Sequence, residues 1–368
     1  MMIEKNIDKF FMNEVLMLAA KGKYTVQPNP MVGAIIVKNN KIVSSGYHKK
    51  PGTPHAEQVA IRKAGVKAKN STLYINLEPC CHYGRTPPCS DLIIDSKISR
   101  VVISSLDPNP LVNGKSVKQL RKSGIIVKIG ILKKESIILN KGFFSKFVNK
   151  RPHITAKFGM SLDGKISLSN GVSKWITSID SRRDVQKERA SHSLIFTSSS
   201  TILKDNPQMT IRDSDLVKKI IKQPDIAILD RNLKIPVTSK IFHDKSRLIY
   251  IFTSRKKASK KYRSNVVLVK TSLVNNMIDI KECLKYLAKQ DINNIFLESG
   301  SRLMSSFLKQ KLIDELLLYI SPKILGQNAV AFSGIKDIEK LSKKIKYSIS
   351  DMIIIKNDLK VKLENYNV

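Results

Sequence analysis

The feature that most constrains the fold of this chain is a set of three potential metal ligands in its N-terminal half. His55-Ala56-Glu57 begins a predicted helix, Pro79-Cys80 follows a predicted strand, and Cys89 begins another helix after eight intervening residues. One imidazole and two thiolates occupy three positions of tetrahedral zinc and leave the fourth open for water, as in catalytic zinc sites. The fold must therefore bring two helix starts and one strand end to the same place.

Glu57 supplies the group that a catalytic zinc site needs besides the metal. It stands too close to His55 to be an obvious fourth ligand, but its carboxylate can reach the water at the open position. Zinc lowers the pKa of that water toward neutrality, and a carboxylate can pass its proton to a ring nitrogen and then to a departing amine. We therefore predict one zinc per chain, held by His55, Cys80 and Cys89, with Glu57 as the catalytic residue of a hydrolytic deaminase. The pattern resembles the H-x-E and P-C signature of the zinc base deaminases.

A structural zinc site is the alternative interpretation of the same residues. It would need a fourth protein ligand, for which Cys81 and His82 are the nearest candidates. Because both adjoin Cys80, simultaneous chelation would be awkward, and we leave both off the metal. A zinc scaffold without catalysis would also give Glu57 no task. Cys283, alone in a predicted helix over 277–289, is expected to be a small buried apolar residue.

The N-terminal half alternates predicted helices and strands, which indicates a sheet with helices on both faces. Asn39-Asn40 tolerates the positive φ of a tight turn and joins two strands in a hairpin. Pro54 begins the helix that carries Glu57. The predicted helices are 8–21, 54–64, 90–96 and 116–122, and the predicted strands are 32–37, 41–45, 72–77, 100–104 and 125–129.

The chain has 368 residues, more than one hydrophobic core usually organises, so we predict two domains. The junction is placed at residues 149–152, where Pro152 ends a helical pattern and a new strand follows. The second domain is also α/β and ends in two antiparallel strands over 346–364, with Asn357-Asp358 at the turn. Its other predicted strands are 154–158, 194–197, 225–229, 247–252, 266–269, 294–297 and 315–320.

The formal net charge of +35 raises nucleic acid as a possible partner, because phosphate contacts dominate such binding. The lysines are scattered, however, as in 218–222 and 256–261, without interleaved aromatic residues or an RNA-binding motif. We expect a solvated basic surface and no nucleic-acid partner, with attraction of small anions as the next possibility. A tRNA or other nucleic-acid base deaminase with a basic accessory domain is the alternative function.

Targeting signals are not evident in the sequence. No apolar run is long enough to cross a bilayer, and residues 1–11 lack the basic end and apolar stretch of a signal peptide. We expect a cytoplasmic enzyme with no membrane partner. In that reducing compartment, three clustered cysteines favour metal binding over disulfides. We also expect a homo-oligomer, whose size the sequence does not fix.

Four longer stretches give the chain a family resemblance. They are LEPCCHYGRTPPC at 77–89, QPNPMVG at 27–33, DPNP at 107–110 and KFGMSLDG at 157–164. Together they resemble the bifunctional deaminase/reductase family of riboflavin biosynthesis, over essentially the whole chain. The resemblance implies a three-layer α/β/α cytidine-deaminase-like domain over 1–147, a zinc-dependent pyrimidine deaminase. It also implies a dihydrofolate-reductase-like α/β domain over 148–368, an NADPH-dependent reductase.

The resemblance implies two successive reactions on a phosphorylated pyrimidine. The diamino-hydroxy-phosphoribosylaminopyrimidine derived from GTP first loses its ring amine as ammonia. NADPH then reduces the ribosyl chain of the aminouracil to ribityl, by hydride delivery to a ring-opened imine. Without the resemblance, the second domain shows no G-x-G-x-x-G fingerprint. It does place residues 298–301 between a strand and a predicted helix over 302–311, where backbone N–H groups could hold phosphates.

The family pattern also implies site residues in the second domain. Arginines among them suit a ribose phosphate, because a guanidinium can bind a phosphate group bidentately. The implied substrate contacts are Ser173, Arg189, Met209, Arg212 and Glu298. The implied cofactor contacts are Gly159, Trp175, Thr201, Asp205, Gly300, Ser301, Arg302, Leu303, Met304, Ser305 and Ser306. The chain departs from the pattern at Asn76, Cys81 and Arg231. Arg231 stands where a small polar residue often touches the cofactor, which leaves its effect on cofactor preference open.

Overall fold

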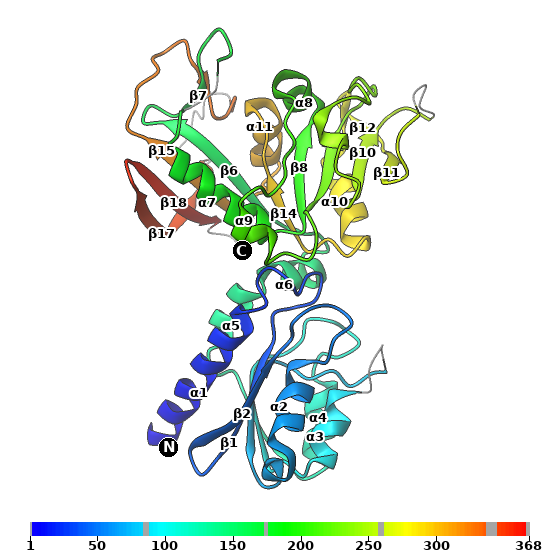
Figure 1. The fold of residues 1–368 in the computed structure, drawn as a ribbon, viewed down its shortest axis with the longest axis vertical. Helices are drawn as coiled ribbons and strands as arrows, with labels where there is room; N and C mark the ends of the chain where they lie inside the picture. The colour runs from blue at the N-terminus through cyan, green and yellow to red at the C-terminus, as the bar shows by residue number, and fades with distance from the viewer. Residues whose placement is uncertain (1, 84–87, 173–175, 257–260, 336–343, 366–368) are drawn as a thin grey trace. The chain divides into compact units, whose positions relative to one another are not determined.

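The computed structural model describes residues 2–83, 88–172, 176–256, 261–335 and 344–365. The chain divides into two compact units, Met1–Lys150 and Arg151–Val368, each built on one main sheet (Figure 1). Within the described ranges, no helix is both long enough and apolar enough to cross a membrane.

The first unit contains a five-stranded sheet in the order β2-β1-β3-β4-β5. The two strands β1 and β2 form the predicted hairpin, and Asn39 and Asn40 adopt φ values of 50° and 56° at its turn. β1 is antiparallel to β3, whereas β3, β4 and β5 are parallel. The strands are β1 (Gly33–Lys38), β2 (Lys41–Tyr47), β3 (Thr72–Leu77), β4 (Arg100–Ser105) and β5 (Ile126–Ile129).

Helices cover both faces of this sheet, which confirms the three-layer prediction (Figure 1). Ala34 and Ile36 point into a core with α2, α3 and α4, whereas Ile35 and Val37 point into a core with α1. α1 begins at Met2 instead of residue 8, the short helix α5 was not predicted, and α6 was anticipated only as the helical pattern before Pro152, without bounds. The helices are α1 (Met2–Ala20), α2 (Ala56–Ala64), α3 (Cys89–Asp95), α4 (Lys115–Lys122), α5 (Lys133–Leu139) and α6 (Lys141–Val148).

The second unit contains a nine-stranded sheet in the order β11-β10-β9-β8-β14-β6-β15-β18-β17. The first seven strands in this order are parallel and the last two are antiparallel, which confirms the predicted antiparallel end. The final turn falls at Lys356-Asn357, one residue earlier than predicted, since Lys356 adopts a φ of 55°. The strands are β6 (His153–Ser161), β8 (Leu194–Ser198), β9 (Asp225–Leu229), β10 (Ile249–Thr253), β11 (Val266–Lys270), β14 (Asn294–Leu297), β15 (Glu315–Ser321), β17 (Tyr347–Ile355) and β18 (Asp358–Asn365).

Both faces of this sheet are buried, so its central strands are almost continuously apolar. One core includes residues of α10 and α11, and the other includes Val185 of α7. Cys283 on α10 is fully buried in the first core, as expected. The helices are α7 (Ile179–Ala190), α8 (Ser199–Asp205), α9 (Ser214–Val217), α10 (Ile280–Lys289) and α11 (Ser301–Lys309).

The predicted helix over 277–289 is wrong at its start. Met277-Ile278 forms strand β13, which pairs with β12 (Leu273–Val274), because Asn275 and Asn276 turn the chain with positive φ. Asp279 then caps α10, since its side chain accepts hydrogen bonds from the first backbone amides of the helix. A second small sheet pairs β7 (Lys165–Ser167) with β16 (Val330–Ala331).

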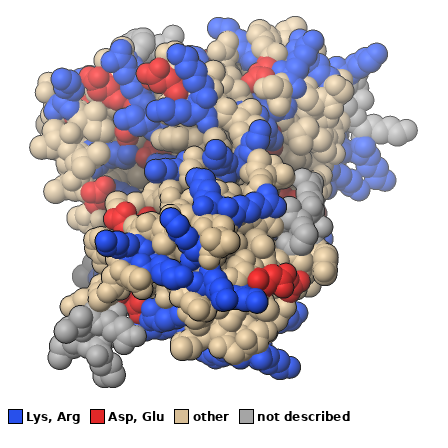
Figure 2. All heavy atoms as spheres, turned by 60° about the horizontal axis from the view of Figure 1, so that its bottom comes forward, with Lys and Arg blue, Asp and Glu red and all other residues tan. Residues whose placement is uncertain are grey.

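Basic side chains are spread widely over the surface. Figure 2 shows Lys and Arg side chains across one face, with Asp and Glu side chains between them. The view shows a mixed surface on that face with an excess of positive charge, in line with the net charge of the sequence.

Candidate active site

The three predicted zinc ligands converge at one point of the first unit. His55 immediately precedes α2, Cys80 follows β3, and Cys89 begins α3. The Nδ1 atom of His55 lies 3.6 Å from Cys80 Sγ and 3.3 Å from Cys89 Sγ, and all three ligand atoms lie within 4.8 Å of one another. Zn–S and Zn–N bonds of about 2.3 and 2.0 Å place tetrahedral ligand atoms roughly 3.5–3.8 Å apart, so the donor set fits zinc.

The environment of these ligands shifts their protonation. The Cys80 thiol accepts hydrogen bonds from the Cys89 thiol and from His55, which lowers the pKa of Cys80 to about 4. The same contact with Cys80, together with burial, raises the pKa of Cys89. The hydrogen bond to Cys80 also raises the pKa of His55. Without a metal, Cys80 is therefore the thiolate of the group, and Cys89 keeps its proton and donates it to Cys80. Thiolates are the form that binds zinc, so metal binding at this site should release the Cys89 proton.

Glu57 lies on the first turn of α2 and is 3% exposed. Burial raises the pKa of its carboxyl to about 7. Glu57, His55 and Cys80 line a cavity of about 230 Å³. The other residues on its wall include Asn29, His48, His82, Asp107, Asn109 and Phe143.

Cys81 and His82 do not belong to the group of converging ligands. Cys81 is partly exposed, and its thiol points to the carbonyl of Leu111 at 3.8 Å. His82 lines the cavity. The described residues thus offer three protein ligands at this point, which matches an open coordination position.

The predicted substrate loop over 27–33 forms part of the cavity wall and is held by asparagine side chains. Asn140 Oδ1 accepts a hydrogen bond from the Met31 amide at 2.7 Å, and its Nδ2 donates to the Met31 carbonyl at 2.9 Å. Asn76 accepts from the Gly33 amide at 2.9 Å and also donates to the Met31 carbonyl. The departure at Asn76 is therefore accommodated by two hydrogen bonds to the loop.

His48 is a cavity residue that the sequence did not single out. Its Nδ1 lies 3.2 Å from the Pro54 carbonyl, which can only accept, so Nδ1 carries the proton. Its Nε2 then accepts from Asn29 Nδ2 at 2.9 Å. Burial lowers the pKa of His48, which favours this neutral ring. A neutral His48 fixes which way the Asn29 amide faces in the cavity.

The DPNP turn at 107–110 is fastened to the site by Glu78, which directly precedes Pro79-Cys80. Glu78 Oε2 accepts from the amides of Asp107 at 3.2 Å and Gly114 at 2.9 Å. Its Oε1 accepts from Ser116 Oγ at 2.8 Å. Burial raises the pKa of Asp107, a cavity residue, to about 7. A buried carboxylate beside the ligand motif therefore shapes this part of the wall.

In the second unit, most predicted cofactor positions lie at the carboxyl ends of parallel strands. Gly159 is near the end of β6, Thr201 and Asp205 lie on α8 after β8, and Gly300 follows β14. β6, β14 and β8 are adjacent and parallel, so their carboxyl ends lie side by side at one end of the sheet. Ligands of open α/β sheets bind just beyond the carboxyl ends of the strands.

The predicted turn over 300–306 is the start of α11. A Cβ added to Gly300 would meet no atom within 4 Å, so the approach to this helix start is open. Leu303 and Met304 are packed in the core, so only their backbone groups could contact a ligand. Arg302 is exposed and Ser301 and Ser306 are partly exposed, whereas Ser305 is buried and accepts from the Gly334 amide.

Two predicted substrate residues bind each other. Arg189 at the end of α7 donates to both carboxylate oxygens of Glu298, and Lys157 on β6 lies 3.4 Å from the same carboxylate. Lys157 was named only within the KFGMSLDG motif, and its place beside Glu298 follows from the pairing of β6 with β14. The three residues form one charged cluster near the carboxyl ends of β6 and β14.

The remaining predicted positions have different settings. Met209 is buried and Arg212 is exposed, both on the loop that links α8 to α9. Arg231 Nη1 donates to the Asn276 carbonyl at 2.6 Å, which ties it to the β12–β13 hairpin. Ser173 and Trp175 lie outside the described residues.

Two protein-family models match the chain. The model for the RibD C-terminal domain matches residues 152–355, and the model for the cytidine and deoxycytidylate deaminase zinc-binding region matches residues 5–105. Each match falls within one of the two compact units.

Full-length relatives and solved structures agree with these matches. The chain is 43% identical to the riboflavin biosynthesis protein RibD of Buchnera aphidicola, over 98% of this chain and 99% of that protein. It is 40% identical to that of Aquifex aeolicus, over 95% and 96% of the two chains. Among solved structures, Acinetobacter baumannii RibD matches with a TM-score of 0.90 and 35% identity, over 98% of this chain and 99% of that one. A deaminase/reductase from Thermotoga maritima matches with a TM-score of 0.87 and 34% identity over the same shares.

Proposed function

The chain belongs to the RibD family of bifunctional deaminase/reductases in riboflavin biosynthesis, and we propose that its two units catalyse successive steps on one phosphorylated pyrimidine. The Thermotoga relative is named a diaminohydroxyphosphoribosylaminopyrimidine deaminase and 5-amino-6-(5-phosphoribosylamino)uracil reductase, and we assign the same two substrates here. Residues 1–147 are assigned to the deaminase and residues 148–368 to the reductase.

The observation that carries the deaminase assignment is the convergence of His55, Cys80 and Cys89 at zinc-ligand spacing, with Glu57 buried beside them. Zinc, when bound there, supplies a Lewis acid that brings the pKa of water toward neutrality. Glu57 takes a proton from the attacking water and delivers it to the ring nitrogen. It then transfers the remaining proton of the added hydroxyl to the leaving amine. The carbon–nitrogen bond to the ring amine breaks, ammonia leaves, and the ring carbon becomes a carbonyl.

The reductase assignment is supported by the charged cluster of Lys157, Arg189 and Glu298 and by the open start of α11. NADPH, when bound, supplies the hydride. We propose that Gly159, Thr201, Asp205 and residues 300–306 hold the cofactor, with the backbone N–H groups of the first turn of α11 facing its phosphates. The proposed substrate residues are Arg189, Met209, Arg212 and Glu298, and Ser173 and Trp175 keep the roles that the resemblance implies.

The test measures both half-reactions on two variants of the full chain. Glu57→Gln keeps the shape of the side chain but removes the proton acceptor, so deamination should fall about 100-fold or more. Reduction of supplied deaminated intermediate with NADPH should stay near wild type. Arg212→Ala should raise the KM of reduction for the phosphorylated intermediate while ammonia release is unchanged.

Two outcomes would contradict the proposal. If folded Glu57→Gln lost reduction of the supplied intermediate, the two sites would not be independent. If the wild-type chain released ammonia from tRNA but not from the pyrimidine, the nucleic-acid deaminase would replace the present assignment.

A further inference from the structure

Arg247 is a buried arginine that neither proposed reaction uses. It precedes β10, and its side chain is 0% exposed. Its Nη2 donates to the Gln208 carbonyl at 2.6 Å, and its Nη1 donates to the Met209 carbonyl at 2.8 Å. Removing a guanidinium from water is costly unless its donors are satisfied. The two shortest hydrogen bonds of Arg247 go to the backbone of the loop over 206–212, and Nη2 also lies 3.4 Å from the Ile241 carbonyl. Nε lies 3.9 Å from Asp244 Oδ2 and has no hydrogen-bond partner among the described residues. Burial lowers the pKa of Arg247 to about 10, so the side chain stays charged at neutral pH.

The loop that Arg247 holds, residues 206–212, carries Met209 and Arg212. Side chains from elsewhere hold its backbone between the Gln208 carbonyl and the Arg212 amide. Besides the two bonds from Arg247, Arg189 donates a hydrogen bond to the Thr210 carbonyl at 3.3 Å. Gln223 accepts from the Ile211 amide at 2.7 Å and donates to the Ile211 carbonyl at 2.9 Å. Gln186 accepts from the Arg212 amide at 2.9 Å. The path of the loop is thus set by these four side chains.

Met209 has the conformation that most needs such support. Its φ is 50°, in the left-handed region that a long side chain seldom occupies, and its side chain is 6% exposed within the core. Such a backbone persists when the surrounding contacts over-determine it. Arg247 supplies the hydrogen bonds on the carbonyls of Met209 and of the residue before it.

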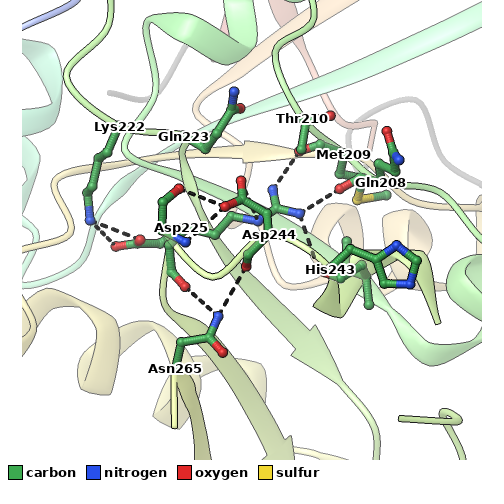
Figure 3. A network of polar contacts seen from close by, with 12 residues as sticks. Gln208, Met209, Thr210, Lys222, Gln223, Asp225, His243, Asp244 and Asn265 are labelled. Carbon is green, nitrogen blue, oxygen red and sulfur yellow. Dashed lines mark hydrogen bonds and ion pairs between the residues drawn. The ribbon is translucent and has the colours of Figure 1, made fainter. Parts of the chain in front are cut away.

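The backbone around Arg247 is itself held by side chains, whose labelled members appear in Figure 3. Asn265 Nδ2 donates to the carbonyls of Arg247 at 2.9 Å and of Asp244 at 3.2 Å. Asp225 accepts from the Leu248 amide at 2.9 Å and from Lys222 Nζ. The guanidinium therefore projects from a fixed backbone toward the loop.

We propose that Arg247 is a positioning residue of the reductase: by holding the carbonyls of Gln208 and Met209, it places Arg212 and the backbone of Met209 for the phosphorylated substrate. The inference rests on the proposed reductase function. The loop is also joined to the charged cluster, because Arg189 bonds both Thr210 and Glu298. Loss of the Arg247 contacts therefore disturbs the placement of the substrate without touching a group that reacts.

The test uses the full zinc-loaded chain with Arg247→Met, which keeps an unbranched side chain and removes all donors. We expect the KM of reduction for the deaminated intermediate to rise roughly tenfold or more, because small displacements of substrate contacts are costly. The KM for NADPH, zinc content and ammonia release should match wild type. Arg263→Met is the matched control, since Arg263 also donates to a backbone carbonyl, that of Phe242 at 3.0 Å, without contacting the loop. Its reduction kinetics should be unchanged.

A double variant separates positioning from a general loss of stability. If Arg247 acts by placing Arg212, Arg247→Met should raise the KM much less in an Arg212→Ala background than in wild type. If Arg247→Met does not fold, Arg247→Lys is measured instead, because one ammonium keeps the charge but cannot span both carbonyls as a guanidinium does.

The inference is overturned if the folded variant reduces the intermediate with an unchanged KM, or if the two substitutions act additively. A failure of the proposed function would look different, because the wild-type chain itself would then fail to reduce the supplied intermediate with NADPH.

Discussion

Arg189 and Glu298 form a bidentate ion pair in the second unit, with Nε–Oε1 and Nη2–Oε2 distances of 2.6 and 3.0 Å. Arg189 lies in the last turn of α7 and Glu298 directly follows β14, so the pair joins a helix to the carboxyl end of a central strand. Burial disfavours the ionised form of Glu298, but the charges of Arg189 and Lys157 outweigh it and lower the pKa of Glu298 to about 2. The carboxylate is therefore ionised throughout the neutral range.

We predict that Glu298→Gln destabilises the second unit by about 3–5 kcal/mol at pH 7, because it leaves a buried arginine without its counter-ion. The folded-state pKa of Glu298, about 2, lies below its value of about 4.3 in an unfolded chain. Its stabilisation is thus present above about pH 4.3 and is lost as the pH falls toward 2. Calorimetric unfolding should show a smaller difference in unfolding free energy between wild type and variant at about pH 3.5 than at pH 7. Glu364→Gln, at an exposed pair with Lys362, should change stability by less than about 0.5 kcal/mol.

We predict that Cys89→Ser loses both zinc and deamination, because the site depends on two thiolates. Cys81→Ser is the matched control, since Cys81 adjoins the motif but its thiol points to Leu111. Metal analysis of purified protein should find one zinc per chain in wild type and in Cys81→Ser, and little in Cys89→Ser. Full deamination by metal-free protein would refute the zinc assignment.

We predict that Glu78→Gln weakens the deaminase without affecting reduction. An amide in place of the carboxylate puts an N–H group against donors from Asp107, Gly114 or Ser116, at a cost of about 1–3 kcal/mol. The wall over 107–117 should loosen, which lowers kcat/KM for ammonia release. Glu135→Gln on α5 removes an equal charge away from this network and should behave as wild type. Equal deamination by both variants would show that Glu78 does not shape the cavity.

We predict that nucleic acid binds weakly, without sequence preference, and dissociates at modest salt. The charge of +35 comes from scattered lysines without stacking aromatic residues. Titration of labelled tRNA against the protein at low and physiological ionic strength checks this, with both half-reactions followed in the same buffers. Tight, selective RNA binding at physiological salt would favour the base-editing alternative.

The convergence of His55, Cys80 and Cys89 could be predicted because its signals are local. A helix start, a strand end and a second helix start each have a signature within a few residues. His and Cys are typical zinc ligands, and Glu is a typical proton carrier, so the residue types themselves indicate the chemistry. The same holds for the hairpin at Asn39-Asn40, where asparagine accepts positive φ. The short helix α5 has no comparable signal, and the turn at Asn275-Asn276 lies between apolar residues that resemble the start of a helix.

The sequence by itself predicted the α/β class, the family and the meeting of His55, Cys80 and Cys89 with Glu57 beside them. Only the tertiary structure decided that Arg189 pairs with Glu298, that His48 orients Asn29, and that Arg247 holds the loop carrying Met209. The physical reason is that each of these contacts joins polar groups that are distant in the chain, and several end on backbone carbonyls. Periodicity and motif spacing record which face of an element is buried, but not which distant donor will meet a given carbonyl.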